Sequence, residues 1–251
     1  MDSGKVKHNF FCKDIPRPAN NESIALSSPE SHHAIRVLRL EQGDAVGLLD
    51  GRGTIAKGRI CAITGSSRHP GVKVEVIEHR QVCPPTPRIH LYAAPPRAKK
   101  MVDIVRQATE LGIHRLIPVI CRYNVAKPER CRTAPKQRWL QEATAALKQS
   151  GNPFMPEFTA PADFDDALAK APAWGIFGDA DAARRMPSED KTLASAQDVG
   201  IWIGPEAGFH SDEKLALDRY GCIPVSAGPW TLRVETAVPA LIGWLRGRGF
   251  A

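Results

Sequence analysis

The sequence predicts an α/β protein in which a small β-barrel precedes a larger domain built on a mainly parallel sheet. Segments of strand character dominate residues 1–80, three prolines stand close together in 81–87, and strands alternate with helices over 88–251. Many short strands are typical of a small barrel, whereas strand–helix alternation is typical of βαβ units. We therefore expect an amino-terminal domain over 1–80, a stiff linker over 81–87 and a second domain over 88–251.

In the first domain we expect several short strands and one short helix. The helix should begin at Ser28 as N-cap, with Pro29 at the first helical position. The segment 72–79 alternates apolar and polar residues, which is the period of a half-buried strand. The strands expected here are 23–26, 45–50, 54–63 and 72–79, with a polar loop between the last two.

In the second domain, apolar runs typical of strands alternate with amphipathic segments typical of helices. We expect strands at 88–94, 115–120, 173–178, 199–204 and 222–226, and helices at 99–113, 135–151 and 211–220. Gly112 and Gly151 should end the first two helices, because glycine readily adopts the left-handed conformation that follows a helix. In parallel sheets of this kind, ligands bind beyond the carboxyl ends of the strands.

Composition and charge narrow the class of protein. No apolar run reaches the ~18 residues of a membrane span, and the first residues lack a secretory signal, so we expect a cytoplasmic protein. Six scattered cysteines without a C-x-x-C pair predict reduced thiols and no metal site. Residues 97–138 hold 11 lysines and arginines against three acidic residues, a difference of +8. Such a segment suits a phosphate backbone, although a merely solvated basic face is the alternative.

Three segments pass from an apolar strand into a turn that contains glycine, namely 176–182, 203–209 and 225–236. Glycine lets a backbone approach a ligand closely, so three such turns at neighbouring strand ends predict a pocket. The common phosphate-loop, metalloprotease and hydrolase motifs are absent from the sequence. The segment 51–56 matches G-x-G-x-x-A, but a strand follows it where a dinucleotide motif needs a helix.

Several motifs occur in an order that resembles one known family. They are "HHAIRVLRLEQGD", "LLDGRG", "MVDIVRQATELGIHRLIPVICRYNV", "RWLQEATAALKQSG", "IGPEAGF" and "GPWTLRVETA", and they extend from about Phe10 to Leu245. The chain resembles the bacterial 16S ribosomal RNA uracil-N3 methyltransferase family, which belongs to the SPOUT class. The resemblance implies a PUA-like RNA-binding barrel over 1–80 and a SPOUT α/β domain over 88–251 with a deep trefoil knot.

The resemblance also implies an activity, a cofactor and partners. The activity is methylation of N3 of a uridine in 16S ribosomal RNA of the small subunit, in this family uridine 1498, by a homodimer formed through the knot region. The cofactor is S-adenosylmethionine, held without a metal. Its implied contacts are Gly178, Ile203, Gly204, Pro205, Glu206, Gly208, Ser226, Gly228 and Leu232.

Two residues are candidates for the chemistry. Arg233, which the resemblance also places beside the cofactor, would stabilise negative charge on the uracil oxygens. Glu235 would accept the N3 proton or position Arg233, or it would simply begin the last helix, where an acidic residue favours the dipole. The RNA-binding candidates are His33, Arg36, Arg39, Lys99, Lys100, Arg122 and Arg138. Arg36 and Arg39 should share a helix face, with two solvated arginines as the alternative.

The chain departs from the family pattern at several positions. Ala207 replaces a usual glycine, Trp230 replaces a usual arginine, "KQSGN" at 148–152 replaces E-Q-x-G-R, and Pro239 falls inside the last expected helix. These departures leave two alternatives to a uracil-N3 methyltransferase. One is a non-catalytic ribosomal RNA-binding assembly factor. The other is a SPOUT methyltransferase with a different RNA target, such as a ribose 2′-hydroxyl or a tRNA base.

Overall fold

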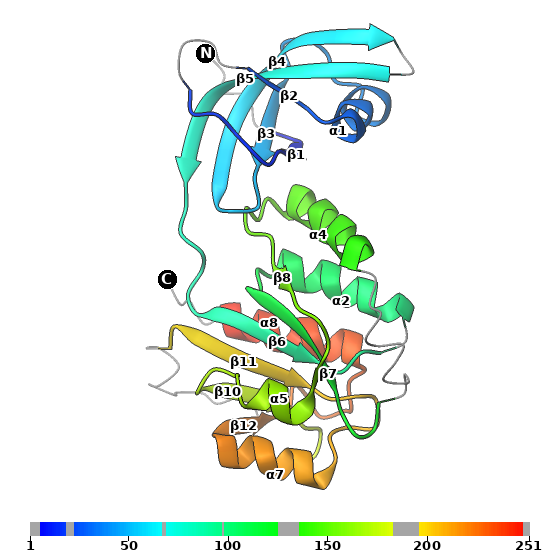
Figure 1. The fold of residues 1–251 in the computed structure, drawn as a ribbon, viewed down its shortest axis with the longest axis vertical. Helices are drawn as coiled ribbons and strands as arrows, with labels where there is room; N and C mark the ends of the chain where they lie inside the picture. Colours follow the sequence, from blue (N-terminus) through cyan, green and yellow to red (C-terminus); the bar gives the residue numbers. More distant parts are fainter. Residues whose placement is uncertain are drawn as a thin grey trace. The chain divides into compact units, whose positions relative to one another are not determined.

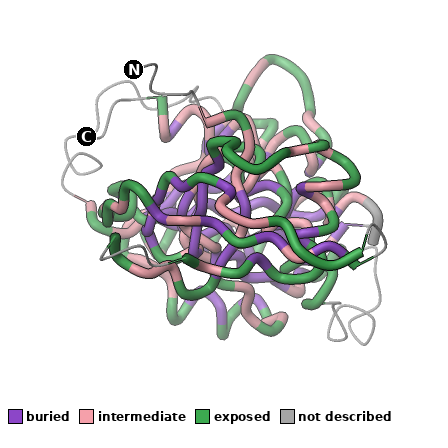
Figure 2. The backbone as a smooth tube through the Cα atoms, turned by 90° about the horizontal axis from the view of Figure 1, so that it is seen from above, coloured by how far each residue is buried: buried purple, intermediate pink, exposed green. Residues whose placement is uncertain are grey.

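The chain divides into two compact units (Figure 1). The computed structural model describes residues 6–18, 23–66, 69–96, 98–124, 136–182 and 196–247, without the side chains of residues 98 and 99. The first unit contains residues 1–84 and 144–155, and the second contains 85–143 and 156–251. Figure 2 shows that the buried parts of the chain lie in its interior, whereas the outer parts are mostly exposed.

The first unit is built on a five-stranded sheet of order β1-β3-β4-β5-β2. Its strands are β1 (Asn9–Phe11), β2 (Ser23–Ala25), β3 (Ala45–Leu49), β4 (Thr54–Ser66) and β5 (His69–Gln81). The expected polar loop between the last two strands is wrong, because their pairing continues to Ser66 opposite His69. Strand pairing satisfies backbone N–H and C=O groups whatever the side chains are, so polar residues can extend the ladder into solvent.

The short helix of this unit begins one residue earlier than expected. Helix α1 (Ser28–His32) is capped by Ser27, whose side chain accepts a hydrogen bond from Glu30 N, so Ser28 is not the N-cap and Pro29 is not first. The chain continues as a π-helical turn η1 (His33–Val37). Arg39 lies after this turn and has φ of 55°, which is not a right-handed helical conformation. The expectation that Arg36 and Arg39 share a helix face is therefore wrong.

An ion pair joins distant parts of the first unit. Lys148 Nζ lies 2.9 Å from a carboxylate oxygen of Glu30, and the Glu30 side chain is only 10% exposed. Asn9 Nδ2 donates to the carbonyl of Lys148 at 3.0 Å. Lys148 is one of the departures from the family pattern, and here it neutralises a buried carboxylate that would otherwise be costly.

The second unit contains a seven-stranded sheet in which every pairing is parallel, which confirms the predicted mainly parallel sheet. The order is β12-β10-β11-β6-β7-β8, and β9 also pairs with β7. The strands are β6 (Arg88–Ala93), β7 (Arg115–Ile120), β8 (Glu157–Phe158), β9 (Ala162–Asp163), β10 (Gly175–Gly178), β11 (Asp198–Ile203) and β12 (Cys222–Val225). Strands β1, β8 and β9, which the sequence reading missed, have two or three residues each, too few to show a period.

Helices cover this sheet. They are α2 (Ala98–Glu110), α5 (Phe164–Leu168), α7 (Ser211–Tyr220) and α8 (Val234–Gly247), while α4 (Lys136–Ser150) runs from the second unit into the residues of the first. Helix α2 packs against α8, and α5 packs against α7. The core on the α5 and α7 side includes Tyr92 and Trp202, whose rings stack at 4.0 Å. Helix α8 continues through Pro239.

Arg246 ties the last turn of α8 to the end of α2. Its guanidinium donates to the carbonyls of Leu111 at 3.3 Å, Gly112 at 2.6 Å and Pro87 at 2.9 Å. Burial lowers its pKa to about 10, so the side chain is charged at neutral pH. A cation at the carboxyl end of a helix also interacts favourably with the helix dipole.

We expect Arg246→Met to lower the free energy of unfolding by about 3 kcal/mol, because three carbonyls lose a charged donor. Urea denaturation would show this as a lower midpoint with an unchanged slope. The matched control is Arg219→Met in the last turn of α7, an exposed arginine whose replacement should change stability by less than about 0.5 kcal/mol. Equal effects of the two substitutions would contradict the proposed role of Arg246.

Candidate functional site

A cavity of about 280 Å³ lies at the carboxyl ends of β10, β11 and β12. Strand β10 lies between the other two, with Phe177 opposite Trp202 on one side and Gly178 opposite Val225 on the other. The loops that follow the three strands are therefore neighbours in space, as the three glycine-containing turns predict. The first turn of α8 and its residue Leu241 complete the wall of the cavity.

Most of the residues expected to contact a cofactor line this cavity. They are Gly178, Ile203, Gly204, Pro205, Glu206, Gly208, Ser226 and Leu232. Gly228 is not among the lining residues, and its carbonyl instead accepts a hydrogen bond from Ser226 Oγ at 2.7 Å. Gly228 therefore takes part in the hydrogen bonding of the third loop without lining the cavity.

The sequence reading missed several lining residues, among them Asp179, Asp181, Phe209, Lys214, Trp230 and Leu241. Asp179 and Asp181 follow directly after a predicted strand, and this position was a usable signal. Lys214 and Leu241 lie on helices that are remote from the turns in sequence, so only the packing of those helices brings them to the site.

The second loop turns sharply after β11. Gly208 N donates to the carbonyl of Pro205 at 2.8 Å, and Gly208 has φ of 79°. Ala207, which replaces the usual glycine, does not have a positive φ, because Arg39 is the only non-glycine residue with positive φ among the described residues. The backbone therefore accepts an alanine at this position without strain. At Gly204 the constraint is contact, since an added Cβ would lie 3.0 Å from the ring of Phe209 and 3.1 Å from its N.

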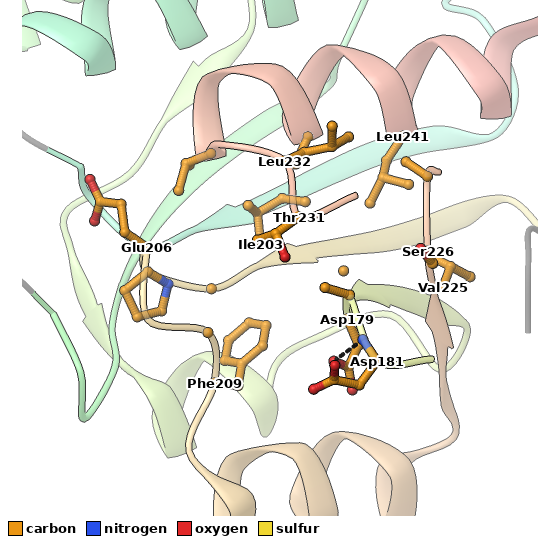
Figure 3. Close-up of a pocket in the computed structure, with 18 of the residues that line it drawn as sticks. Asp179, Asp181, Ile203, Glu206, Phe209, Val225, Ser226, Thr231, Leu232 and Leu241 are labelled. Atoms are coloured by element: carbon orange, nitrogen blue, oxygen red, sulfur yellow. Dashed lines mark hydrogen bonds between the residues drawn. The ribbon is translucent and has the colours of Figure 1, made fainter. Parts of the chain in front are cut away.

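The cavity has an apolar side and an acidic side. Figure 3 shows Ile203, Leu232 and Leu241 on one side and Asp179 with Asp181 on the other, whereas the Glu206 carboxylate points away. Asp179 Oδ1 accepts hydrogen bonds from Lys214 Nζ at 2.8 Å and from Asp181 N at 3.2 Å. The arrangement suits a ligand that has an apolar surface and also carries positive charge or hydroxyl donors.

Arg233 and Glu235 lie beside the cavity and do not line it. Arg233 directly precedes α8, its carbonyl accepts hydrogen bonds from Thr236 N and Ala237 N of the first helical turn, and its side chain is exposed. Glu235 lies in the first turn of α8, and its Oε1 is 2.8 Å from Lys100 Nζ. The hydrogen bond from Lys100 lowers the pKa of Glu235. Its other oxygen is buried and has no hydrogen-bond partner among the described residues.

The expected RNA-binding residues are divided between the two units. In the first unit Arg36 and Arg39 are exposed, while His33 packs edge-on to Phe10 at 6.5 Å. In the second unit Arg138 is exposed, and the Lys99 side chain lies outside the described residues. Arg122 lies 3.1 Å from a carboxylate oxygen of Asp212.

The positive charge of residues 97–138 is partly neutralised in the folded protein by acidic residues from other segments. Acidic residues from other segments pair with several of its cations, namely Glu235 with Lys100, Glu142 with Arg106, Glu157 with Arg115 and Asp212 with Arg122. A count along the chain therefore overstates the local field. Within the described part of the chain, there is no group of three or more potential metal ligands and no helix long and apolar enough to cross a membrane.

Comparisons with known proteins agree with this architecture. The profile of an RNA methyltransferase domain matches residues 84–246, and that of an RNA methyltransferase PUA domain matches 26–67. The chain is 28% identical over 225 residues to ribosomal RNA small subunit methyltransferase E of Aquifex aeolicus, covering 88% of this chain and 93% of that protein. The protein of the same name from Bacillus subtilis is 26% identical over 227 residues, with 86% of each chain covered.

A solved structure shares the fold. Ribosomal RNA small subunit methyltransferase E from Neisseria gonorrhoeae, bound to S-adenosyl methionine, superposes with a TM-score of 0.79 at 21% identity, covering 96% of this chain and 97% of that chain. The expected fold class, a PUA-like domain followed by an α/β domain with a parallel sheet, is confirmed. The trefoil knot stays a prediction from the resemblance.

Proposed function

Because this chain belongs to the RNA methyltransferase family, we propose that it methylates N3 of a uridine in 16S ribosomal RNA, uridine 1498 by its resemblance, with S-adenosylmethionine as donor. The observation that carries the proposal is the cavity at the ends of β10, β11 and β12. All of its lining residues fall within the segment 84–246 that matches the family. Relatives that share most of their length with this chain act on small-subunit ribosomal RNA, as their names state.

The residues of the cavity fit S-adenosylmethionine. Its volume of about 280 Å³ is close to the lower end of small-molecule pockets, roughly 300–1,000 Å³. Ile203, Leu232 and Leu241 would contact apolar parts of the molecule. Asp181 would favour its positive charge, since Asp179 is already paired with Lys214, and both carboxylates would accept bonds from hydroxyl groups. When bound, the cofactor supplies an electrophilic methyl group on a sulfonium centre.

The chain's own contribution is alignment and charge stabilisation. Uracil N3 is a poor nucleophile while it carries its proton, so negative charge must develop on the base as that proton passes to solvent water. Arg233 is an exposed cation between two residues that line the cavity, Leu232 and Val234, and it can donate to the uracil oxygens there. Holding the base and the methyl group in line supplies much of the remaining rate enhancement.

Glu235 is poorly suited to accept the N3 proton. The hydrogen bond from Lys100 lowers its pKa and makes the carboxylate a weaker base than an ordinary glutamate. We therefore assign Glu235 and Lys100 a positioning role at the start of α8, beside Arg233. The expected function of Lys100 as an independent phosphate contact becomes less favourable for the same reason, because its charge is already paired.

RNA binding is assigned to basic residues of both units. Arg36 and Arg39 of the first unit and Arg138 of the second are exposed, and they suit phosphate contacts that position the substrate without reading its sequence. Such contacts weaken as salt rises, because binding releases counterions from the RNA. We also propose the homodimer that the resemblance implies.

The decisive test is to map methylated nucleotides in 16S ribosomal RNA from strains with and without the gene. Mass spectrometry of the digests should show loss of one N3-methyluridine in the deletion strain and its return on complementation. Methylation that is unchanged by the deletion would favour an assembly factor, and loss of a different methylated nucleotide would favour another target. Either result would overturn the proposal.

A further inference from the structure

Trp230 is a large aromatic side chain left in water at the mouth of the cavity. It lines the cavity, yet it is 79% exposed. Six other large apolar side chains in the described part of the chain are exposed, at 39% to 61%, and none of them lines the cavity. An indole kept out of the core at this position contributes little to folding and is available to a ligand.

The loop that carries Trp230 is held in place. Ser226 Oγ donates to the carbonyl of Gly228 at 2.7 Å, and Pro229 restricts the backbone directly before the tryptophan. Two residues later, Leu232 packs at the apolar side of the cavity (Figure 3). The indole therefore projects from a loop with anchors on both sides, which limits the entropy lost when it binds a planar group.

The surroundings of Trp230 indicate what kind of group it binds. Its neighbours in the loop are Pro229 and Thr231, and the next charged residue is the exposed Arg233. A subunit interface needs a contiguous apolar patch, whereas here a single exposed ring is followed along the chain by Thr231 and, three residues after it, by the exposed cation Arg233. A single planar ring with a cation nearby is the arrangement that recognises one unstacked base.

We propose that Trp230 stacks on the target base of the RNA and holds it at the mouth of the cavity. This inference rests on the proposed function. The N3 atom lies on the Watson–Crick edge of uracil, so the base must leave any helix before it can react, and it loses its stacking partners. The indole replaces those partners on the face of the base and leaves the edge with O2, N3 and O4 open to Arg233 and the methyl donor.

The position also explains a departure from the family pattern. Trp230 stands where an arginine is usual, so a charge contact is exchanged for a stacking contact. Stacking on an aromatic ring depends much less on salt than an ion pair with RNA does. The proposal therefore predicts that Trp230→Arg restores a contact whose strength falls as salt rises, whereas the natural side chain contributes nearly equally at low and high salt.

The test compares Trp230→Ala, Trp230→Phe and Trp230→Arg with the natural enzyme, on small ribosomal subunits that lack the methyl group. Trp230→Ala should raise KM for the subunits by about 5- to 150-fold, the range set by loss of one stacking contact. Trp230→Phe should retain most of the affinity, and the S-adenosylmethionine Kd should stay within about twofold in all variants. Leu215→Ala, at an exposed apolar residue that does not line the cavity, is the matched control and should change neither value.

Each other outcome overturns the stacking assignment. An equal loss of cofactor affinity in Trp230→Ala would make the indole a cover for the cofactor. A change of oligomeric state in sedimentation would make it a subunit contact, and an unchanged KM would leave it without a role in RNA binding. If the natural enzyme itself neither binds the cofactor nor methylates the subunits, then it is the proposed function that fails, so the two failures are distinguishable.

Discussion

Leucine in place of Gly178 should abolish measurable S-adenosylmethionine binding and leave the fold intact. A Cβ at Gly178 would lie 3.6 Å from Ile203 Cδ1 and 3.8 Å from Leu241 Cδ1, and both of these side chains line the cavity. The first added carbon therefore makes ordinary contacts, and the rest of the leucine side chain extends into a space of about 280 Å³. Gly178 is not among the glycines with positive φ, so a side chain is tolerated by the backbone.

We expect the Kd of Gly178→Leu for S-adenosylmethionine to rise more than about 100-fold, since the substituted side chain and the cofactor compete for one volume. Isothermal titration calorimetry measures the affinity, and circular dichroism on heating checks the fold. Gly243→Leu on α8 is the size-matched control, because nothing lies within 4 Å of a Cβ added there. Natural affinity in Gly178→Leu would show that the cofactor binds elsewhere.

Alanine in place of Arg233 should lower kcat by about 10²- to 10³-fold, the loss typical when one donor to a developing negative charge is removed. The S-adenosylmethionine Kd should change by less than about twofold, because the Arg233 side chain is exposed and does not line the cavity. The start of α8 should survive, since Arg233 contributes to it through its backbone carbonyl, which the substitution leaves in place.

Single-turnover methylation of small ribosomal subunits, at saturating cofactor, separates the chemical step from RNA binding. Arg233→Lys should recover part of the rate, because it keeps the charge and loses the planar set of donors. A normal single-turnover rate in Arg233→Ala would remove the residue from the chemistry. A rate that recovers fully when more RNA is added would make Arg233 a binding residue only.

The chain's local patterns were sufficient to predict most of the second unit. Strands such as 115–120 and helices such as 211–220 are visible as apolar runs and caps, and the alternation of the two predicted a parallel sheet that the structure confirms. Predictions from local patterns were less accurate where an adjacent residue or a pairing strand determined the bounds of an element. Ser27 displaced Ser28 as the cap of α1, and strand pairing carried β4 and β5 into the expected loop.

The sequence by itself determined the fold class and the three glycine-containing turns, because periodicity and turn chemistry act over a few neighbouring residues. Only the tertiary structure decided that the turns meet. That depends on β10 pairing with β11 and with β12, and the local sequence of these strands does not indicate which strand pairs with which. The same long-range packing brought Lys214 to Asp179, placed Lys100 on Glu235 and left Trp230 exposed at the cavity. These contacts depend on which apolar surfaces pack against each other, and this packing is determined by the folding of the whole chain.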